Sequence, residues 1–502
     1  MHLYTDAPRS FDMFRLVSPI TLILIALLLI SCDSPPSYFE RIHEHGKLIM
    51  GTRNGPTTFY IDNQGPTGFE YELGKRFAKS LNLELEIQLF STEADMWEAL
   101  DSGHIHFIAY GSPTPDAEGY TFSLGPAYQT ISQKLVFKQG TDWPRDAGDL
   151  TEPVAIPNHR PFIDSLQEIK KSHPDLTWEI HSNRTTEQLL DLLLEEKIAY
   201  TVVNSNELAL HRQFTPDVSI AFSLNHDRPL RWHFPHKEDD SLLGAAFDFF
   251  SALQSNGELE QLVDRYYGHI KRFDYVDTRA FIDAVDEKLP KYLPLFKEAA
   301  EQDIDWRLLA SIGYQESHWN PKARSPTGVR GIMMLTRSTA KQVRIKNRLD
   351  PKQSIMGGAK YFRYLYKLMP NDIREPDRSF FTLASYNVGW GHVNDARYLT
   401  SKAGKDPNKW VHVKEFLPLL RHKKWYSQTK YGYARGDEPV KYVTNIRRYY
   451  QILQWLHNDN PNFHQYKQLN DPEMPQPDST LSELEMPTSL KAGNVLSANS
   501  AL

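Results

Sequence analysis

The spacing of hydrophobic residues changes along the chain. From Lys47 to about Ala109, short hydrophobic segments alternate with segments whose apolar residues recur every three or four positions. Predicted strands occupy 47–52, 83–90 and 104–110, and predicted helices occupy 68–82 and 92–103. Regular alternation of strands and helices is typical of an open α/β sheet.

The same alternation begins again near Pro153. Predicted strands occupy 153–157, 176–181 and 199–204, with predicted helices at 162–169 and 187–194. The stretch 242–268 predicts two helices separated at Asn256-Gly257. Two such lobes joined by crossover strands predict a ligand cleft between them. Tyr60 and Tyr110 are candidate stacking platforms in this cleft; the alternative is that both rings are half-buried.

After Gly268 the pattern becomes helical and continues to about Leu456. This second body of about 180 residues is long enough for an all-α domain. Gly357-Gly358 is interpreted as a helix start. From Asn458 onward Pro, Asn, Ser and Glu dominate without an apolar period, which predicts a disordered tail over 458–502.

The N-terminal segment has the pattern of an export signal. An uncharged, predominantly apolar run ends at Cys32 and follows Arg9 and Arg15, and its length is that of a signal-peptide core. Its last four residues, Leu-Ile-Ser-Cys, resemble a bacterial lipobox, so residues 1–32 are a predicted signal peptide with lipidation at Cys32. The alternative is an uncleaved anchor helix. Asp33 resembles an inner-membrane retention signal.

The overall composition excludes several other classes. Of 502 residues, 40% are hydrophobic and 24% charged, which is typical of a globular protein. The net charge of -6 gives no support to nucleic-acid binding. A single cysteine excludes an intramolecular disulfide. The chain has no zinc-type histidine pair on a helix, no calcium-type loop and no Gly-rich phosphate loop, so we expect no metal and no cofactor.

One acidic residue stands out in the helical body. The spacing predicts a helix over 306–317 with Asp305 as its N-cap. Leu308, Ile312 and Glu316 lie four residues apart and therefore share one stripe, so the glutamate continues an apolar face. Desolvation there would raise its pKa and suit a general acid near neutral pH. The alternative is a glutamate that points outward at a frayed helix end.

The N-terminal body resembles a known family. The segments "GPTGFEYELGKRFAKSLNLELE", "SPTPDAEGYTFSLGPAY" and "NGELEQLVDRYYG", within about 40–270, are similar to periplasmic solute-binding proteins of the polar-amino-acid type. The resemblance implies an arginine and an aspartate for the ligand's carboxylate and ammonium, but this chain has Ala117 and Asn204 there. We therefore expect a cleft that takes a larger cell-wall fragment, such as a muropeptide. The alternative is a purely structural domain.

The helical body, over 277–456, resembles the lytic transglycosylase family, whose catalytic domain has a lysozyme-like all-α fold. The resemblance begins in "ESHWNPKARSPTGVRGIMMLT", where Gly-Ile-Met-Met at 331–334 corresponds to that family's Gly-Leu-Met-Gln. Ser-Tyr-Asn-Val-Gly at 385–389 corresponds to its Ala-Tyr-Asn-Ala-Gly, and Tyr442-Val443 to its late Tyr-Val pair. Met334 departs from the usual glutamine. Fusion to a solute-binding domain resembles one membrane-bound branch of this family.

The resemblance implies a role for each matching residue. Glu316 becomes the single catalytic acid and base, and cleavage between N-acetylmuramic acid and N-acetylglucosamine gives a 1,6-anhydro product without water. The implied substrate-binding or orienting residues are Ser317, Met333, Met334, Tyr386, Asn387 and Tyr442. Tyr442 is expected to hydrogen-bond the Glu316 carboxyl, and no Asp or Glu occurs between Glu316 and Asp350.

The expected fold is thus multidomain, with a two-lobed α/β periplasmic-binding-protein-like N-terminal domain and an all-α lysozyme-like C-terminal domain. The expected partners are peptidoglycan glycan strands, a muropeptide in the N-terminal cleft, and a membrane through the N-terminal lipid. The expected location is the periplasmic side of the cell envelope, at the outer membrane by family resemblance or the inner membrane if Asp33 acts as a retention signal. Two alternatives remain open: a goose-type lysozyme, and a lipoprotein that only binds glycan or solute.

Overall fold

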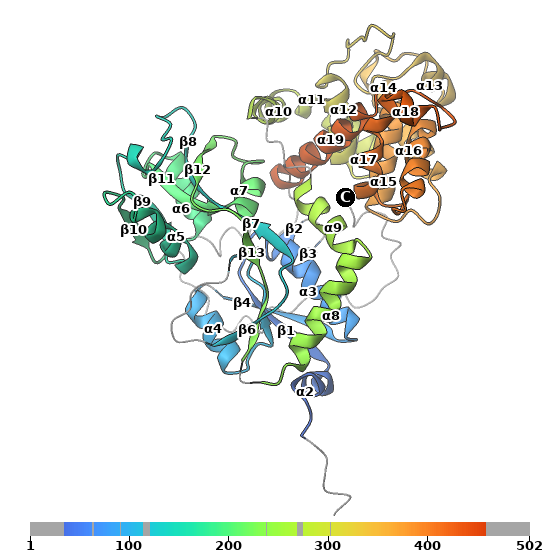
Figure 1. Ribbon diagram of the computed structural model, residues 1–502. Coiled ribbons are helices and arrows are strands. Elements are labelled where there is room, and N and C mark those ends of the chain that lie inside the picture. The colour runs from blue at the N-terminus through green and yellow to red at the C-terminus, as the bar shows by residue number, and fades with distance from the viewer. Residues whose placement is uncertain are drawn as a thin grey trace, which may run out of the picture.

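The computed structural model describes residues 35–62, 65–90, 92–113, 121–236, 238–268, 275–301 and 303–457. The predicted signal peptide with Cys32, and also Asp33, Ala117 and the predicted tail 458–502, lie outside the described residues. Within these ranges no helix combines the length and the hydrophobicity needed to cross a membrane. Two α/β lobes and a helical body make up the structure (Figure 1).

The first lobe is built on a sheet with the strand order β4-β1-β5-β14-β6. The side chains of β1 alternate between two cores: Leu48 and Met50 join the cluster under α2, α3 and α8, whereas Ile49 packs against the cluster of α4. Helices therefore cover both faces of this sheet. The elements are α2 (Tyr38–His45), β1 (Lys47–Thr52), β2 (Tyr60–Asp62), β3 (Gly65–Thr67), α3 (Phe69–Ser80), β4 (Glu84–Leu89), α4 (Glu93–Asp101), β5 (Phe107–Ile108), β6 (Phe122–Leu124), β14 (His233–Pro235), α8 (Ser241–Ser255) and α9 (Glu258–Val263).

The second lobe has the strand order β10-β9-β11-β8-β12 and the same layering. On β8, Leu135 and Phe137 face the cluster that contains α5, and Val136 faces the cluster of α6 and α7. Two connections join the lobes, and they pair as the antiparallel strands β7 and β13. The elements are β7 (Gln129–Ile131), β8 (Gln133–Lys138), η1 (Ala147–Asp149), β9 (Val154–Pro157), α5 (Arg160–Lys170), β10 (Trp178–His181), α6 (Thr186–Leu194), β11 (Tyr200–Asn204), α7 (Ser205–His211), β12 (Val218–Ser223) and β13 (Arg228–Leu230).

The helical body surrounds one hydrophobic core in which α12 and α19 pack against each other and α15 packs on α19. Its helices are α10 (Tyr275–Glu287), α11 (Leu289–Ala300), α12 (Trp306–Ser317), α13 (Arg337–Gln342), α14 (Pro351–Leu368), α15 (Asp377–Val388), α16 (Trp390–Lys402), α17 (Trp410–Phe416), η3 (Pro418–Arg421), α18 (Lys423–Tyr426) and α19 (Asp437–Leu456). The predicted fold class, two α/β lobes followed by an all-α body, is confirmed.

The first lobe docks on the helical body through α9 and the π-helical segment η2 (Asp264–Gly268). Figure 1 shows α8 and α9 rising from the first lobe to this junction. The Arg447 guanidinium on α19 contacts Asp264 Oδ2 at 3.1 Å, and Lys414 on α17 pairs with the same carboxylate. These opposite charges hold the pKa of Asp264 below its usual range against the effect of burial. The two bodies are therefore joined by a buried ion-pair cluster.

Two predictions about particular residues are wrong. Gly357 and Gly358 lie inside α14, which begins at Pro351. A Cβ on Gly358 would lie 2.6 Å from the Met333 side chain, so these glycines allow close packing and do not start the helix. Tyr110 is 1% exposed, and its hydroxyl donates to the Pro113 carbonyl at 2.7 Å, so it is a core residue and not a stacking platform.

Candidate active site

Glu316 lies in the last turn of α12, where the chain reverses. The Asp305 side chain caps the start of the helix by accepting a hydrogen bond from the Arg307 backbone, as predicted. The helix ends at His318 in a left-handed conformation (φ 50°), and Trp319 follows with φ 55°. The Trp319 ring is 1% exposed and donates from Nε1 to the Ala310 carbonyl at 2.8 Å. This buried tryptophan fixes the turn that leaves Glu316 at the end of the apolar stripe.

The Glu316 carboxyl meets the hydroxyl of Tyr442 from α19. Tyr442 is 3% exposed, and its hydroxyl donates to Glu316 Oε1 at 2.6 Å. Burial raises the pKa of Glu316 to about 7, and the hydrogen bond from Tyr442 opposes this rise. Glu316 is half-buried, so part of the residue still reaches the surface. Among the described residues, Tyr442 is the one hydrogen-bond partner of this carboxyl.

A tight turn supports Ser317 beside the acid. Ser317 Oγ donates to the Ile332 carbonyl at 2.8 Å, which ties α12 to the turn at 331–334. Gly331 has φ 85°, and a Cβ there would lie 1.8 Å from the Arg348 carbonyl oxygen, so only glycine fits. Met333 is fully buried, whereas Met334 is half-buried with φ 42°. Of these two methionines, Met334 alone offers side-chain surface to a substrate.

The end of α15 is the fourth segment that contributes residues to the site. The Tyr386 hydroxyl donates to the Met333 carbonyl at 3.1 Å, and its ring is stacked parallel to that of Tyr442 at 6.4 Å between centroids. Burial raises the pKa of Tyr386 well above its usual range, and the nearby Glu316 raises it further. Asn387 is exposed, and Gly389 ends the helix with φ 87°, as predicted.

We call the part-exposed surface formed by Glu316, Ser317, Met334, Tyr386 and Asn387 the Glu316 face. Three hydrogen bonds join the four segments that carry the residues proposed from the sequence: Tyr442 binds Glu316, and Ser317 and Tyr386 both bind backbone carbonyls of the turn at 331–334. Met333 contributes a backbone carbonyl and core packing.

One residue beside this face was missed by sequence reasoning. The Tyr361 ring from α14 lies edge-on to Tyr386 at 5.2 Å between centroids, and burial raises its pKa above the usual range. Its signal in the sequence was weak because Tyr361 lies within a run of aromatic residues, "YFRYLY", that looks like ordinary helix packing. Tyr361 packs against the ring of Tyr386, whose hydroxyl binds the turn at Met333.

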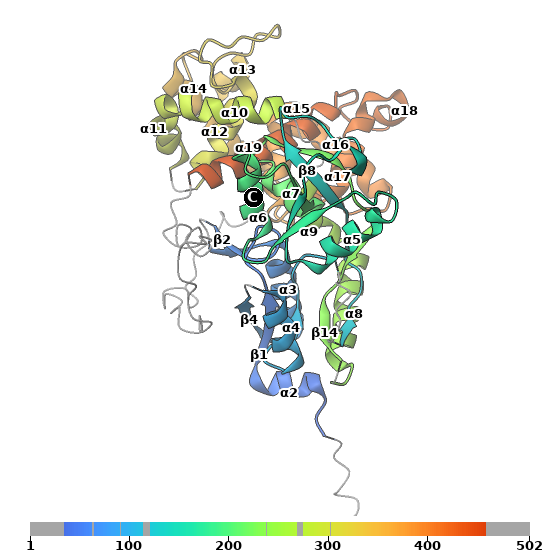
Figure 2. The same ribbon diagram turned by 90° about the vertical axis from the view of Figure 1, so that its left-hand side faces the viewer.

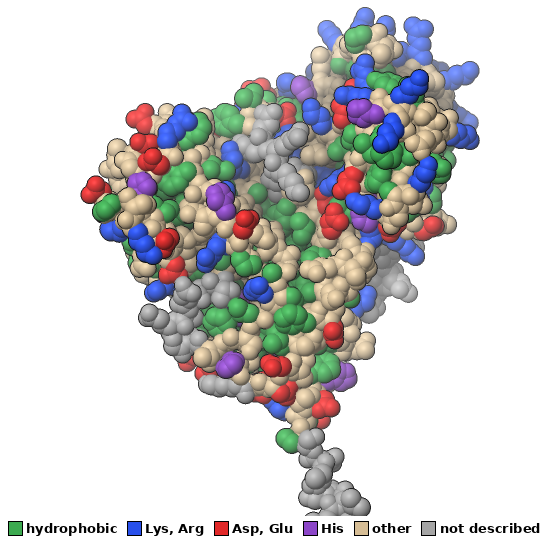
Figure 3. All heavy atoms as spheres, in the orientation of Figure 1, with side chains coloured by type: hydrophobic (Ala, Val, Ile, Leu, Met, Phe, Trp, Pro, Cys, Tyr) green, Lys and Arg blue, Asp and Glu red, His purple; other side chains and the backbone are tan. Residues whose placement is uncertain are grey.

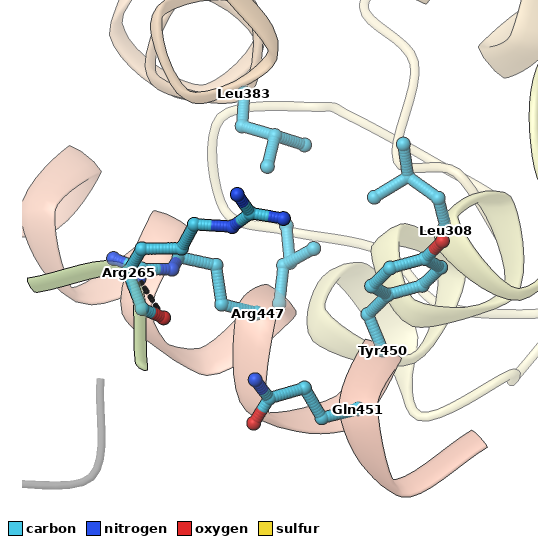
Figure 4. A pocket seen from close by; sticks show the side chains of 7 residues that line it. Arg265, Leu308, Leu383, Arg447, Tyr450 and Gln451 are labelled. Carbon is cyan, nitrogen blue, oxygen red and sulfur yellow. Dashed lines mark hydrogen bonds between the residues drawn. The ribbon is translucent and has the colours of Figure 1, made fainter. Parts of the chain in front are cut away.

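A small pocket lies at the junction of the bodies, apart from the Glu316 face. Figure 4 shows the side chains of Arg265 from η2 and Arg447 from α19 next to each other in this pocket, whose lining also includes Leu308, Leu383, Tyr450 and Gln451. Arg447 Nη2 donates to the Arg265 carbonyl at 3.0 Å. The described residues contain no group of three or more side chains suited to hold a metal ion.

Polar residues also meet where the two lobes face each other. Ser112 Oγ, after β5 of the first lobe, lies 2.7 Å from His159 Nε2 of the second lobe. The other ring nitrogen of His159 contacts Glu93 of α4, and Asn204 Nδ2 donates to Ser112 Oγ at 3.1 Å. Asn204 and Ser112 are both 1% exposed. The position expected to hold an ammonium group is thus occupied by an amide that binds the opposite lobe.

Comparisons with known proteins agree with this division of the chain. Residues 48–269 match the family of bacterial extracellular solute-binding proteins, family 3, and residues 294–409 match the transglycosylase SLT domain. A protein from Vibrio campbellii, described as membrane-bound lytic murein transglycosylase F, is 45% identical over 88% of this chain and 86% of its own length. One from Pseudoalteromonas translucida with the same description is 46% identical over 88% of this chain and 94% of its own length. A solved structure of a mutant of ArgBP from T. maritima matches 46% of this chain and 99% of that chain at 18% identity, with a TM-score of 0.41.

Proposed function

The chain belongs to the family of membrane-bound lytic murein transglycosylases F, and we propose that Glu316 is the residue that performs its reaction. The protein is a peptidoglycan lytic transglycosylase with an N-terminal solute-binding domain. The observation that carries the assignment of Glu316 is its contact with Tyr442, 2.6 Å from hydroxyl to carboxyl, on a part-exposed face.

In the first step, the protonated Glu316 carboxyl donates its proton to the glycosidic oxygen between N-acetylmuramic acid and N-acetylglucosamine. A pKa of about 7 leaves a large fraction of this carboxyl protonated at neutral pH, which an exposed glutamate would not achieve. The bond from the muramic anomeric carbon to that oxygen breaks, and N-acetylglucosamine leaves as the alcohol.

In the second step, the Glu316 carboxylate accepts the proton of the muramic C6 hydroxyl, whose oxygen attacks the anomeric carbon. The product is a 1,6-anhydro sugar, and the carboxyl returns to its protonated form. Because the nucleophile belongs to the substrate, the reaction needs one carboxyl group, whereas most glycosidases need two. The two aromatic side chains beside Glu316 support this proposal because both are neutral: Tyr442 donates to the carboxyl, and Tyr386 is stacked on Tyr442.

The neighbours of Glu316 receive supporting roles in the proposal. Tyr442 orients the carboxyl and holds Oε1, which leaves Oε2 for the substrate. Ser317 and Tyr386 fix the turn that carries Met334 through their bonds to backbone carbonyls. Asn387, which is exposed beside them, is placed to bind sugar acetamido or hydroxyl groups.

Both alternatives to this function are less well supported. A glycan-binding lipoprotein without activity has no use for a desolvated acid with a buried orienting tyrosine. A goose-type lysozyme would use a similar acid but deliver water to the anomeric carbon. The family membership of the whole chain favours the transglycosylase.

The test is the chemistry of the products. Purified peptidoglycan is digested with the wild-type chain and with a Glu316→Gln variant, and the fragments are identified by mass spectrometry. We expect 1,6-anhydromuropeptides from the wild type and none from the variant. Reducing-end products would establish a lysozyme, and anhydro products from Glu316→Gln would remove Glu316 from the reaction.

We also propose that the N-terminal domain senses a cell-wall fragment, such as a muropeptide, and transmits its binding to the helical body. The ion-pair cluster of Asp264 with Arg447 and Lys414 supports this, because α19 carries both Arg447 and Tyr442. Titration of muropeptide into the full chain should change the rate of murein cleavage. An unchanged rate over a range that saturates binding would leave the domain a structural role.

The protein is associated with a membrane of the cell envelope, as the description of its family states. We propose that the attachment is a lipid on Cys32, because the lipobox-like segment ends at this residue. Mass spectrometry of the N-terminal peptide of the mature chain should find a diacylglyceryl cysteine. Fractionation of the envelope decides between the outer membrane, expected from the family, and the inner membrane, expected if Asp33 acts as a retention signal.

A further inference from the structure

The loop region beside the Glu316 face is strongly basic. Between Ser317 and Leu349 the chain has eight Lys and Arg residues and no Asp or Glu, although the whole chain has a net charge of -6. Figure 3 shows Lys and Arg side chains gathered along the edge of the helical body where Figure 1 labels α13 and α14. We call the six exposed cations the basic surface: Lys322, Arg324, Arg337, Lys341, Arg344 and Lys346.

The basic surface has no counterion among the described residues. Across the described parts of the chain, none of its six residues forms an ion pair. The half-buried Arg348 donates to the Leu335 carbonyl at 2.7 Å; burial lowers its pKa, and the neighbouring Arg330 and Arg337 lower it further. Like charges that cluster without partners oppose folding. The cluster therefore indicates an anionic partner from outside the chain.

The basic surface is continuous with the Glu316 face. Arg330 and Leu335 exchange two backbone hydrogen bonds, of 3.2 and 3.1 Å, and these close the turn that contains Ile332, Met333 and Met334. The Ile332 carbonyl binds Ser317, the residue next to the acid. In the chain this turn is flanked by Arg324 and Arg337, so a polymer bound across it passes the loops that carry the cations.

We propose that the basic surface binds the carboxylates of the peptide stems that project from the murein strand being cleaved. This inference rests on the proposed function, since it takes the murein strand as the polymer on the Glu316 face. The stems carry free carboxylates at regular intervals along the strand, so several weak contacts act together. Anionic lipid headgroups offer a similar charge, but the continuity with the Glu316 face favours the substrate over a membrane.

Binding through such contacts has a characteristic dependence on charge and salt. Each exposed ion pair contributes little by itself, and three removed together should weaken binding roughly tenfold. Salt should abolish this difference, because the Debye length falls to about 3 Å at 1 M ionic strength. Uncharged contacts to the sugars would survive the salt.

The experiment measures co-sedimentation of the full chain with insoluble murein sacculi. All proteins carry Glu316→Gln, so binding is measured without cleavage. The test variant adds Arg337→Gln, Lys341→Gln and Lys346→Gln. The matched control adds Lys402→Gln, Lys423→Gln and Lys424→Gln on α16 and α18, and Figure 2 shows α18 on the side of the helical body opposite α13. Thermal unfolding shows whether each variant is folded.

Two probes separate the possible partners. The first probe is sacculi whose carboxylates have been converted to amides with carbodiimide and ammonia, which keeps the glycan and removes the charge. The second probe is vesicles of phosphatidylglycerol and phosphatidylethanolamine in a ratio of about one to three, chosen to carry a surface charge comparable to that of a membrane.

We expect the test variant to bind untreated sacculi roughly ten times more weakly than the parent and the control. On amidated sacculi all three should bind equally, at the level of the test variant. Equal binding of the test variant and the parent to untreated sacculi would overturn the proposal, as would a deficit that persists after amidation. A deficit seen only with vesicles would assign the basic surface to a membrane. Product analysis of the active wild type is independent of these results, so failure here leaves the proposed reaction intact.

Discussion

Two glutamates, one in the first lobe and one in the helical body, have the same raised pKa and very different surroundings. Burial raises the pKa of both Glu70 and Glu316 to about 7. Glu70 is 1% exposed and accepts hydrogen bonds from Tyr128 at 2.6 Å and Trp232 at 2.9 Å, one on each oxygen. Glu316 is half-buried and accepts a hydrogen bond from Tyr442 on one oxygen.

The difference shows that a raised pKa does not by itself identify a catalytic acid. The carboxyl of Glu70 is enclosed, and both of its oxygens are already bound, so no substrate can receive its proton. The pKa of Glu316 is raised to about the same value, but this residue is only half-buried. Tyr442 binds its Oε1, which leaves Oε2 for a substrate. Access and an unused oxygen are therefore the features that distinguish the proposed active site from a buried structural glutamate.

The largest expected effect is the loss of activity in Glu316→Gln. The amide keeps the shape of the side chain but has no proton to donate, so kcat should fall by roughly 10²–10⁴. Glu70→Gln is the matched control, and its kcat should stay within about twofold because the Glu70 carboxyl is enclosed and cannot contact a substrate. Initial rates on purified sacculi check both values. A large loss of kcat in Glu70→Gln would contradict the assignment of Glu70 as a structural residue.

The second effect concerns stability and pH. The pKa of Glu70 is about 7 in the folded chain and 4.5 by itself, so the stability it confers is complete below pH 4.5 and is lost as the pH rises through 7. The loss is about 3 kcal/mol for this single group. Glu70→Gln should therefore remove that part of the pH dependence. Denaturant unfolding of wild type and variant at pH 5 and pH 8 measures this difference in the free energy of unfolding. An equal loss of stability between the two pH values in both proteins would show that Glu70 is not its source.

The third effect tests the orienting role of Tyr442. Tyr442→Phe removes the hydrogen bond to Glu316 while keeping the ring in its buried position. We expect kcat to fall roughly 10- to 100-fold, since a hydrogen bond to a charged group is worth about 1.5–3 kcal/mol. Tyr128→Phe removes the equivalent bond to Glu70 and should change kcat by less than about twofold. Equal rates for Tyr442→Phe and wild type would remove the tyrosine from the mechanism.

The smallest effect is expected at Met334, where the family resemblance of the sequence leads us to expect a glutamine. Met334→Gln places an amide of similar length on the half-buried side of the turn. One added hydrogen bond to a sugar is worth about 1 kcal/mol, so KM should fall by a few-fold with little change in kcat. Steady-state kinetics on a soluble murein fragment provide the measurement. A large fall in kcat would mean that the turn has been distorted.

Local patterns in the sequence predicted most elements of the fold. Lys47–Thr52 forms the expected strand, and the helix capped by Asp305 begins and ends as expected. The interpretation of Gly357-Gly358 as a helix start failed because the need for glycine there comes from residues outside the helix: Ile345 and Leu335 pack against Gly357, and Met333 packs against Gly358. A glycine pair gives the same signal whether it lies at the start of a helix or allows a neighbouring side chain to pack closely.

The two glutamates also differ in how far sequence could predict their environments. The contact between Glu316 and Tyr442 spans 126 positions, and only the family resemblance indicated it. Glu70 lies in the first turn of an amphipathic helix, where an exposed acid is the ordinary expectation. Its partners Tyr128 and Trp232 are 58 and 162 positions away, so no local pattern could reveal its burial.

The most direct test of the central claim is the pH dependence of kcat/KM for wild type and Tyr442→Phe. The claim is that the Glu316 carboxyl alone donates the proton. Burial raises its pKa to about 7, and the hydrogen bond from Tyr442 opposes part of this rise. The wild-type rate should fall above about pH 7, and Tyr442→Phe should move this fall to higher pH by about one unit. A fall that begins near pH 4.5, or one that Tyr442→Phe leaves in place, would contradict the account.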